Sequence, residues 1–393
     1  MQPLKGITVV SLEHAIAAPF ASRQLADLGA RVIKVERPTV GDFARRYDER
    51  AKGLSSHFVW TNRSKESLTL DLKDPEAQEV LKLLIKQEAD VLVQNLAPGA
   101  AQRMGLSYED LSKSKPDIIV CDISGYGSDG PYASKKAYDL LIQSEAGFLS
   151  TTGTKDQVAK AGISIADISA GMYAYTNILA ALMHRQQTGQ GQRIDISMME
   201  SLSEWMSYPL YYSMDGAEPP PRAGASHASI YPYGPFEAGD GKVVMLGLQN
   251  EREWLVFCEK VLLNAHLTRD ERFNTNTKRS EAREDLKALI VQVFSSLTAA
   301  QVSERLEAAG IANAQVNSMA EVWSHEQLKH RNRWRKVQTP AGEMPALIPP
   351  GSWSKGQPRM DAIPELGQHT DSILRELGKT KLQIDEMRLR NAI

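Results

Sequence analysis

One carboxylate stands out in the 393-residue sequence because of its neighbours. Asp167 lies in AGISIADISAG, residues 161–171, among small and apolar side chains. A carboxylate that is poorly solvated by such neighbours is more reactive, and proteins use this group as a covalent nucleophile. Asp167 also has a structural interpretation, because Ser164 and Asp167 have the S-x-x-D spacing of a capping box at a helix start. The two roles are compatible, since the helix macrodipole stabilises an anion in the first helical turn.

A long helix is expected to carry Asp167, over residues 165–187. Apolar residues recur there at spacings of four and three, which places them on one helix face. These residues are Ile168, Met172, Tyr175, Leu179 and Leu182. The TGQGQ segment that follows ends the predicted helix.

The first third of the chain alternates short apolar strands with helices. ITVVSL and RVIKVE flank PFASRQLADLGA, a helical segment with Pro19 near its start and Gly29 near its end. ESLTLDL, DVLVQNL, DIIVCDIS and RIDISMM continue the strand pattern. Near-continuous apolar strands of this kind are typical of a parallel sheet that is covered on both faces. The sequence therefore predicts an α/β fold with a large Rossmann-like parallel sheet.

The order of elements changes from residue 231 onward. YPYGPFEA and KVVMLGL, separated by a DG turn, predict a β-hairpin. Helical segments follow near 251–263, 281–296 and 299–309. DGAEPPPRAGASHAS before this region and TPAGEMPALIPPGSW after it are rich in proline and small residues, which marks domain edges. We expect a large domain over 1–215, a smaller α+β domain over 226–330, and a further C-terminal segment over 345–393.

Composition narrows the classes of protein to consider. The net charge of −2 and the 42% hydrophobic content do not favour binding to nucleic acid or to a membrane surface. No stretch reaches the roughly 18 apolar residues of a membrane span, and the start lacks the pattern of a signal peptide. Cys121 and Cys258 have no CxxC spacing, so neither a disulfide framework nor a zinc site is expected. We expect a cytoplasmic protein.

Familiar cofactor motifs are missing from the sequence. The turn after the first strand reads EHAIAAPF and lacks the G-x-G-x-x-G of dinucleotide-binding folds, although Glu36 occupies the usual place of a ribose-binding acid. A structural role is favoured for Glu36. TGTKD lacks P-loop spacing, no G-x-S-x-G occurs, and His325 and His330 are better explained as solvated residues than as metal ligands. We expect no metal site.

Eight segments, taken together and in order, resemble the type III CoA-transferases, the group that includes formyl-CoA:oxalate and carnitine CoA-transferases. They are AAPFASRQLADLGARVIKVERP, NRSKESLTLDLK, NLAPGAAQRMGLSYEDL, ISGYGSDGPYA, AYDLLIQSEAGFLSTTG, ISIADISAGMYA, HRQQTGQGQRIDISMMES and LGQHTDSILRELG. They span nearly the whole chain.

This resemblance implies a fold and a mechanism. The large domain is made from both chain ends, so residues 345–393 return to it, and two ring-like subunits form an interlocked homodimer. Asp167 attacks the acyl-CoA to give a mixed anhydride, and the released thiolate converts this into an aspartyl-CoA thioester that passes CoA to an acceptor acid. No cofactor is bound permanently, because the coenzyme A thioester is itself a substrate.

The resemblance also implies the residues that contact CoA. Arginine and lysine suit the phosphates of CoA, and uncharged residues suit the pantetheine. The matched positions are His14, Ala15, Ile16, Ala17, Arg37, Leu70, Lys73, Asn95, Leu96, Arg103, Met104, Lys136 and Tyr138.

Two departures from formyl-CoA transferase bear on the substrate. Ile16 replaces a glutamine that contacts the reacting acyl group, and LGLQNEREW has only Gly247 where that enzyme has a glycine-rich loop. We therefore expect acceptor contacts from Ile16, His227 and Gln249, a small dicarboxylate as acceptor, and succinyl-CoA as a plausible donor. Arg45, Arg46 and Arg222 are further basic candidates near the entrance. An α-methylacyl-CoA racemase and a non-catalytic acyl-CoA-binding protein stay open as alternatives.

Overall fold

The computed structural model describes residues 2–393, which form two compact units. Unit 1 comprises the described part of Met1–Gly147 together with Ala161–Ser207 and Gln327–Ile393. Unit 2 comprises Phe148–Lys160 and Tyr208–Glu326. Both ends of the chain therefore belong to one unit, and the middle of the chain forms the other.

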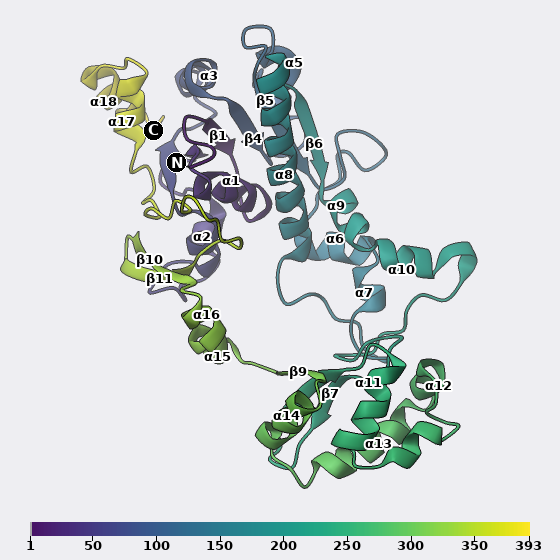
Figure 1. Ribbon diagram of the computed structural model, residues 1–393. Helices are drawn as coiled ribbons and strands as arrows, with labels where there is room; N and C mark the ends of the chain where they lie inside the picture. Colours follow the sequence, from purple (N-terminus) through teal and green to yellow (C-terminus); the bar gives the residue numbers. More distant parts are fainter. Residues whose placement is uncertain (1) are drawn as a thin grey trace. The chain divides into compact units, whose positions relative to one another are not determined.

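Unit 1 is built on a six-stranded parallel sheet (Figure 1). Its strands are β1 (Thr8–Leu12), β2 (Arg31–Glu36), β3 (Lys65–Thr69), β4 (Val91–Gln94), β5 (Ile119–Ser124) and β6 (Arg193–Ser197). They lie in the order β3-β2-β1-β4-β5-β6, which is the order of a doubly wound, Rossmann-type sheet. The predicted α/β fold class is confirmed, and the strands coincide with the apolar runs of the sequence.

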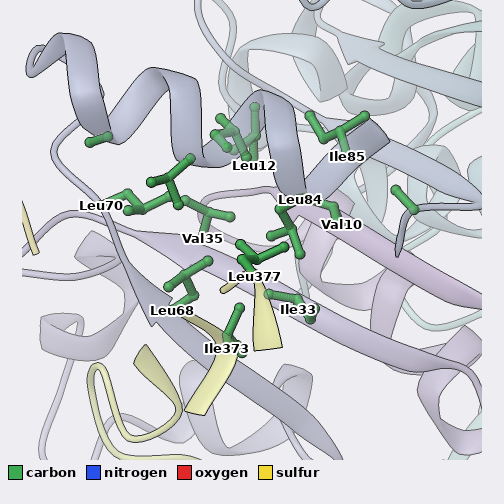
Figure 2. Close-up of a cluster of buried hydrophobic side chains, with 14 of the residues drawn as sticks. Val10, Leu12, Ile33, Val35, Leu68, Leu70, Leu84, Ile85, Ile373 and Leu377 are labelled. Carbon is green, nitrogen blue, oxygen red and sulfur yellow. The ribbon is translucent and has the colours of Figure 1, made fainter. Parts of the chain in front are cut away.

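Helices connect and cover these strands. They are α1 (Ala17–Asp27), α2 (Ser56–Thr61), α3 (Pro75–Glu88), α4 (Ala100–Arg103), α5 (Tyr108–Leu111), α6 (Asp139–Glu145), α8 (Ile165–Thr188), α9 (Met198–Trp205), α16 (Glu326–His330), α17 (Thr370–Glu376) and α18 (Lys381–Leu389). Apolar side chains of β1, β2, β3, α3 and α17 meet in one buried cluster, where Leu84 and Ile373 lie close to Ile33 (Figure 2). The C-terminal segment is thereby tied to the sheet.

Helix α8 confirms the predicted helix, but its fully buried face differs from the expected one. The residues expected to line that face, Ile168 among them, are only half-buried. The fully buried residues of α8 are mostly small: Ala166, Ser169, Ala170, Gly171, Ala174, Ile178 and Ala181. A Cβ atom on Gly171 would lie 2.7 Å from the carbonyl oxygen of Ala17, which is too close for any side chain. Small residues are needed here because α8 and α1 pack with their backbones close together.

Unit 2 has a three-stranded antiparallel sheet of β7 (Tyr233–Glu237), β8 (Val243–Gly247) and β9 (Ala312–Gln315), and β7 and β8 form the predicted hairpin. Its helices are α7 (Phe148–Thr151), α10 (Ser207–Tyr212, with Ser207 in unit 1), α11 (Glu251–Val256), α12 (Asn276–Glu281), α13 (Arg283–Phe294), α14 (Ala299–Ala308) and α15 (Met319–Ser324). Buried aromatic residues, including Phe236, Trp254 and Phe294, dominate its core. Across the described residues, no single helix has both the length and the apolar composition of a membrane span, whereas α13 and α14 together, bent by 105°, meet these two criteria.

Two local features differ from the sequence-based expectations. The TPAGEMPALIPPGSW segment, expected as a domain edge, contains β11 (Gly342–Leu347), which forms a hairpin with the preceding strand β10 (Trp334–Thr339). This hairpin tolerates Pro345 because it is a separate two-stranded sheet with open edges. Residues 148–160 and 208–215 belong to unit 2 although they were expected in the large domain, and residues 327–330 belong to unit 1 although they were expected in the smaller domain. Arg222 Nε and the Gly224 amide donate to the carbonyl oxygens of Thr154 and Gly153, which joins residues 148–160 to unit 2.

Candidate active site

The site is built where the order of the sheet reverses, between β1 and β4. Doubly wound sheets bind ligands at this point, outside the carboxyl ends of the strands. The loops that follow the two strands are joined by a pair of hydrogen bonds. The His14 amide donates to Asn95 Oδ1 over 2.9 Å, and Asn95 Nδ2 donates to the His14 carbonyl oxygen over 2.9 Å. Two of the residues predicted to bind CoA therefore hold each other in place.

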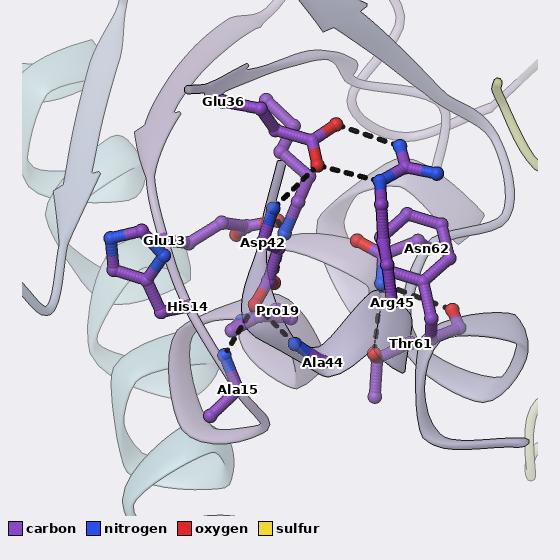
Figure 3. A network of polar contacts seen from close by, with 12 residues as sticks. Glu13, His14, Ala15, Pro19, Glu36, Asp42, Ala44, Arg45, Thr61 and Asn62 are labelled. Carbon is purple, nitrogen blue, oxygen red and sulfur yellow. Dashed lines mark hydrogen bonds and ion pairs between the residues drawn. The ribbon is translucent and has the colours of Figure 1, made fainter. Parts of the chain in front are cut away.

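The turn between β1 and α1 has no glycine, although its backbone adopts a conformation that favours glycine. Ala15 has a φ angle of 61°. The buried carboxylate of Asp42 accepts hydrogen bonds from the Ala15 amide at 3.2 Å and from the Ala44 amide at 2.9 Å (Figure 3). Ile16 and Ala17, which open α1, are each only 2% exposed. The buried Asp42 carboxylate, and not the conformational freedom of a glycine, thus stabilises the conformation of this turn.

Asp167 lies in the first turn of α8, but a different residue caps this helix. Asp139, at the start of α6, accepts hydrogen bonds through Oδ1 from the Ala166 amide at 2.8 Å and from the Asp167 amide at 3.3 Å. Ser164 occupies the N-cap position and makes no capping hydrogen bond with its side chain. The predicted capping box is therefore wrong. The reason is that Asp139 already accepts from these backbone donors, from an element distant in sequence.

The Asp167 carboxyl group is half-buried and unpartnered. Within residues 2–393 it makes no hydrogen bond and no ion pair. Burial, and secondarily the negative charge of Asp139, raise the pKa of Asp167 from 3.8 to about 7. This direction is opposite to the one expected from the helix macrodipole, because burial disfavours the charged form and Asp139 adds a negative charge. Near neutral pH the group is divided between a neutral acid and a poorly solvated, reactive carboxylate.

Aromatic rings extend from the turn toward Asp167. The His14 ring stacks on Phe43 with centroids 5.5 Å apart, and Phe43 contacts Tyr47 at 5.7 Å. Burial and the negative charges of Asp42 and Asp167 raise the pKa of Tyr47 to about 12, so Tyr47 stays protonated and can donate a hydrogen bond. His14 Nδ1 is buried and has no hydrogen-bond partner in the described part of the chain. Burial lowers the pKa of His14, which keeps this ring neutral near pH 7.

Four cations predicted to bind CoA lie in the connections that follow β2, β3, β4 and β5. They are Arg37, Lys73, Arg103 and Lys136, and all four are exposed. None of their side chains forms an ion pair or hydrogen bond with another residue of the 2–393 range. They are therefore free to bind an anion at the same edge of the sheet as Asp167.

Three other basic residues of unit 1, Arg45, Lys34 and Lys65, are already paired with carboxylates. Glu36 accepts two hydrogen bonds of 2.8 Å from Arg45 and one of 2.6 Å from Ser67. This supports the structural role for Glu36 and leaves Arg45, expected near the substrate entrance, occupied by an ion pair. Lys34 and Lys65 are buried in ion pairs with carboxylates.

The remaining predicted CoA contacts differ in accessibility. Tyr138 is 68% exposed and directly precedes Asp139. Leu96 and Met104 are half-buried and pack against the main core. Leu70 is fully buried in that core, so any contact of Leu70 with a ligand has to come from its backbone.

The predicted acceptor contacts lie in both units. Ile16 belongs to unit 1, whereas His227 and Gln249 belong to unit 2. The His227 ring stacks on Tyr233 at 5.3 Å, and its Nδ1 accepts from the Ser229 and Ile230 amides. Gln249 is exposed. Their contact with substrate stays a prediction.

Sequence reasoning missed three residues of the site: Asp42, Tyr47 and Asp139. Asp139 is contained in the AYDLLIQSEAG segment that carried part of the resemblance, and it directly follows Tyr138. The available signal was a carboxylate at a helix start, which is a common capping pattern. In the part of the chain that the structure covers, no group of three or more His, Cys, Asp or Glu residues is placed to hold a metal ion.

Comparisons with known proteins agree with this geometry. Residues 4–370 match the family model described as CoA-transferase family III. The chain is 34% identical to succinyl-CoA:glutarate CoA-transferase of Mus musculus, covering 96% of this chain and 87% of the relative. It is 32% identical to succinate–glutarate CoA-transferase of Agrobacterium fabrum, covering 95% and 96% of the two chains.

A solved structure is similar over nearly the same length. The crystal structure of a CAIB/BAIF family protein from Brucella suis superposes with a TM-score of 0.85 at 32% identity, covering 95% of this chain and 99% of that one. The match of the family model over almost the entire chain, together with these relatives, shows that this protein belongs to CoA-transferase family III and is a CoA-transferase.

Proposed function

We propose that the protein transfers CoA from succinyl-CoA, or a similar acyl-CoA, to a small dicarboxylic acid through covalent intermediates on Asp167. The observation that carries this proposal is the half-buried Asp167 carboxyl group, which has no partner among the described residues and a pKa raised to about 7. A carboxylate without hydrogen bonds or counter-ion keeps its electron pairs available for attack on a thioester. The activities for which the two relatives are named suggest the donor and the class of acceptor.

The proposed reaction begins with attack by an Asp167 oxygen on the thioester carbonyl carbon. The C–S bond breaks, and CoA leaves as a thiolate while a mixed anhydride forms. The thiolate then attacks the aspartyl carbonyl carbon, which releases the donor carboxylate and leaves an aspartyl-CoA thioester. Each step exchanges one activated acyl group for another of similar energy, so no ATP is required.

The second half of the reaction reverses these steps with the acceptor. A carboxylate oxygen of the acceptor attacks the aspartyl thioester carbon and expels the thiolate, which forms a second anhydride. The thiolate attacks the acceptor carbonyl carbon of this anhydride, and Asp167 leaves as a carboxylate. No proton is gained or lost over the cycle, so the site needs no general acid of its own.

The proposed orientation of CoA follows from the distribution of charge. The free cations Arg37, Lys73, Arg103 and Lys136 suit the phosphates and the nucleotide end. The uncharged turn of His14, Ala15, Ile16 and Ala17 suits the pantetheine and the thioester. Asn95 holds this turn through its two hydrogen bonds with His14.

We also propose that two copies of the chain form an interlocked homodimer, as the family resemblance implies. Threaded subunits would bury more than the roughly 1,200–2,000 Å² of a standard interface. Light scattering should therefore give the mass of a dimer even at micromolar concentration. A monomer under those conditions would contradict the interlocked arrangement.

Hydroxylamine trapping tests the covalent mechanism. The enzyme is incubated with succinyl-CoA and no acceptor, treated with hydroxylamine, and digested for mass spectrometry. We expect a hydroxamate on Asp167, with loss of activity in proportion. A racemase or a non-catalytic binder would leave Asp167 unmodified, and an Asp167→Asn variant is the matched control.

A substrate panel tests the acceptor class. Succinyl-CoA and acetyl-CoA are combined with di- and monocarboxylates, and the new acyl-CoA is identified by mass. We expect the highest kcat/KM for succinyl-CoA with a short dicarboxylate. Preference for a monocarboxylate would contradict the proposed acceptor class without affecting the covalent mechanism.

A further inference from the structure

A network of buried charges lies directly beneath the β1–α1 turn. Glu13, Lys34, Asp42 and Lys65 are essentially inaccessible to solvent. Lys34 Nζ lies 3.2 Å from Glu13 Oε1 and 2.8 Å from Asp42 Oδ2, and Lys65 Nζ lies 2.6 Å from Glu13 Oε1. Glu13 directly follows β1, Lys34 lies in β2, Lys65 is the first residue of β3, and Asp42 lies in the loop after β2. The network therefore joins three neighbouring strands of the sheet.

The network reaches the turn through the Asp42 carboxylate. Its Oδ2 binds Lys34, while its Oδ1 accepts the backbone amides of Ala15 and Ala44 (Figure 3). Ala15 has a left-handed backbone conformation, which is unfavourable for any residue with a Cβ atom. A hydrogen bond from its amide to a fixed anion offsets that strain. Asp42 therefore selects the conformation of the turn.

The turn is also in contact with the helix that carries Asp167. Ala15 is followed by Ile16 and Ala17, and the carbonyl oxygen of Ala17 lies against Gly171. Gly171 is one helical turn after Asp167 on α8. A change in the backbone at Ala15 would thus move the start of α1 against the start of α8.

We propose that Asp42 is a positioning residue for CoA transfer, which holds the β1–α1 turn in the geometry that places the thioester against Asp167. This inference rests on the proposed function, in which that turn binds the acyl end of CoA. Asp42 is buried beneath the turn, so it acts through the Ala15 amide and does not touch the reacting atoms. Buried ion pairs add little net stability relative to well-packed apolar residues, and the hydrogen bond from the Ala15 amide to Asp42 gives this network a role in the geometry of the turn.

A pair of matched variants tests the proposal. Asp42→Asn removes the charge that holds Ala15 and keeps the size of the side chain. Glu36→Gln makes the same change at a neighbouring carboxylate that is 2% exposed, accepts the Asp42 amide and is not hydrogen-bonded to the turn. For Asp42→Asn we expect kcat to fall about tenfold or more, with a smaller change in the KM for acyl-CoA. For Glu36→Gln we expect a loss of thermal stability and nearly normal kcat.

Rescue by glycine separates positioning from a general loss of folding. Ala15→Gly removes the Cβ atom that makes the left-handed conformation unfavourable. Added to Asp42→Asn, it should restore kcat by several-fold while leaving the melting temperature of Asp42→Asn nearly unchanged. If Asp42 has only a structural role, Ala15→Gly should not rescue kcat, and Asp42→Asn and Glu36→Gln should lose kcat to the same extent. Either of these results overturns the inference.

A second variant covers the case in which Asp42→Asn does not fold. Ala15→Val makes the left-handed backbone conformation more unfavourable, because valine is β-branched, and it changes no charged residue. We expect the same loss of kcat, and a normal kcat would contradict the proposal. Hydroxylamine trapping of the wild-type enzyme is run in parallel. No trapping in wild type refutes the covalent mechanism, whereas trapping in wild type with unaltered kcat in Ala15→Val refutes only the role of Asp42.

Discussion

Two carboxylates of unit 1, the fully buried Glu13 and the half-buried Asp167, have pKa values shifted in opposite directions. Burial by itself raises the pKa of both Glu13 and Asp167. At Glu13 the ion pairs with Lys65 and Lys34 outweigh burial and lower the pKa to about 2. At Asp167 no cation of residues 2–393 offsets burial, and Asp139 adds a negative charge, so the pKa rises to about 7. Glu13 is the more deeply buried of the two and still has the lower pKa, so the partners decide the direction of the shift.

The same unit therefore contains a carboxylate with a structural role, Glu13, and a carboxylate suited to act as a nucleophile, Asp167. The start of α8 has backbone amides that would solvate a carboxylate, but Asp139 accepts from two of them. Asp139 therefore accepts hydrogen bonds from two free backbone amides at the start of α8. These amides are then not available as hydrogen-bond donors to the Asp167 side chain. A carboxylate that lacks partners in this way is costly to the fold and useful for chemistry.

Asp167→Asn should give the largest effect and test the reagent side of the comparison. We expect turnover to fall at least about 10⁴-fold, as when a covalent nucleophile is removed. CoA binding should persist, since the free cations that suit CoA are unchanged. Steady-state kinetics and calorimetric titration with CoA measure the two properties. Near-normal turnover in a folded variant would refute the role of Asp167.

The same variant should be more stable than wild type at high pH. The folded pKa of Asp167, about 7, lies above its ordinary value of 3.8, so the stability of wild type falls as pH rises between these values and levels off above 7. The advantage of Asp167→Asn should grow by at most about 1.4 kcal/mol per pH unit across that window. Urea unfolding from pH 4 to pH 9 checks this, and a difference that does not depend on pH would contradict the raised pKa.

Glu13→Gln tests the structural side of the comparison. It leaves Lys34 and Lys65 buried with one carboxylate fewer, and we expect a loss of about 3–5 kcal/mol in the free energy of unfolding. In wild type the contribution of Glu13 is present above its ordinary pKa of 4.5 and is lost as pH falls toward about 2. Denaturant unfolding at pH 7 and at pH 3 measures both effects. Equal stability of the variant and wild type at pH 7 would show that the ion pairs are not decisive.

Arg37→Ala and Arg45→Ala extend the comparison to cations. Arg37 is exposed and unpaired among the described residues, so we expect a KM for acyl-CoA about tenfold higher and unchanged stability. Arg45 is paired with Glu36, so its loss should lower the melting temperature and leave the KM nearly constant. Ile16→Gln is the complementary variant, which should shift acceptor preference more than CoA affinity. A changed acceptor preference in Arg37→Ala, with unchanged KM, would contradict the assigned positions.

Asp139→Asn should have the smallest effect. Asparagine keeps the cap of α8, so stability should change little, but the negative charge next to Asp167 is lost. We expect the rise of kcat/KM with pH to occur at lower pH than in wild type, because the Asp139 charge raises the pKa of Asp167. The pH profile of kcat/KM is the measurement. A profile that does not move would assign the raised pKa to burial alone.

The sequence by itself determined the elements and the chemical candidates. The apolar runs predicted the strands, because a parallel sheet covered on both faces needs continuous apolar residues. Asp167 was predicted from the residues and the resemblance, and the four cations from the resemblance; Asp167 lies in the first turn of α8, and the cations lie in the connections that follow β2 to β5, with Arg103 at the end of α4. The strand pattern is local, so a short stretch of sequence is sufficient to predict it, whereas the cations were assigned through a resemblance that spans nearly the whole chain.

Only the tertiary structure decided the partners of each charge. The cap on α8 comes from Asp139, 28 positions from Asp167, and Glu13 is paired with Lys65 across 52 positions. The small-residue face of α8 likewise depends on how closely α1 approaches it. The sequence does not distinguish a charged residue that forms an ion pair from one that is unpaired. Their pKa values, and with them their roles, depend on desolvation and on neighbours that only the folded chain brings together.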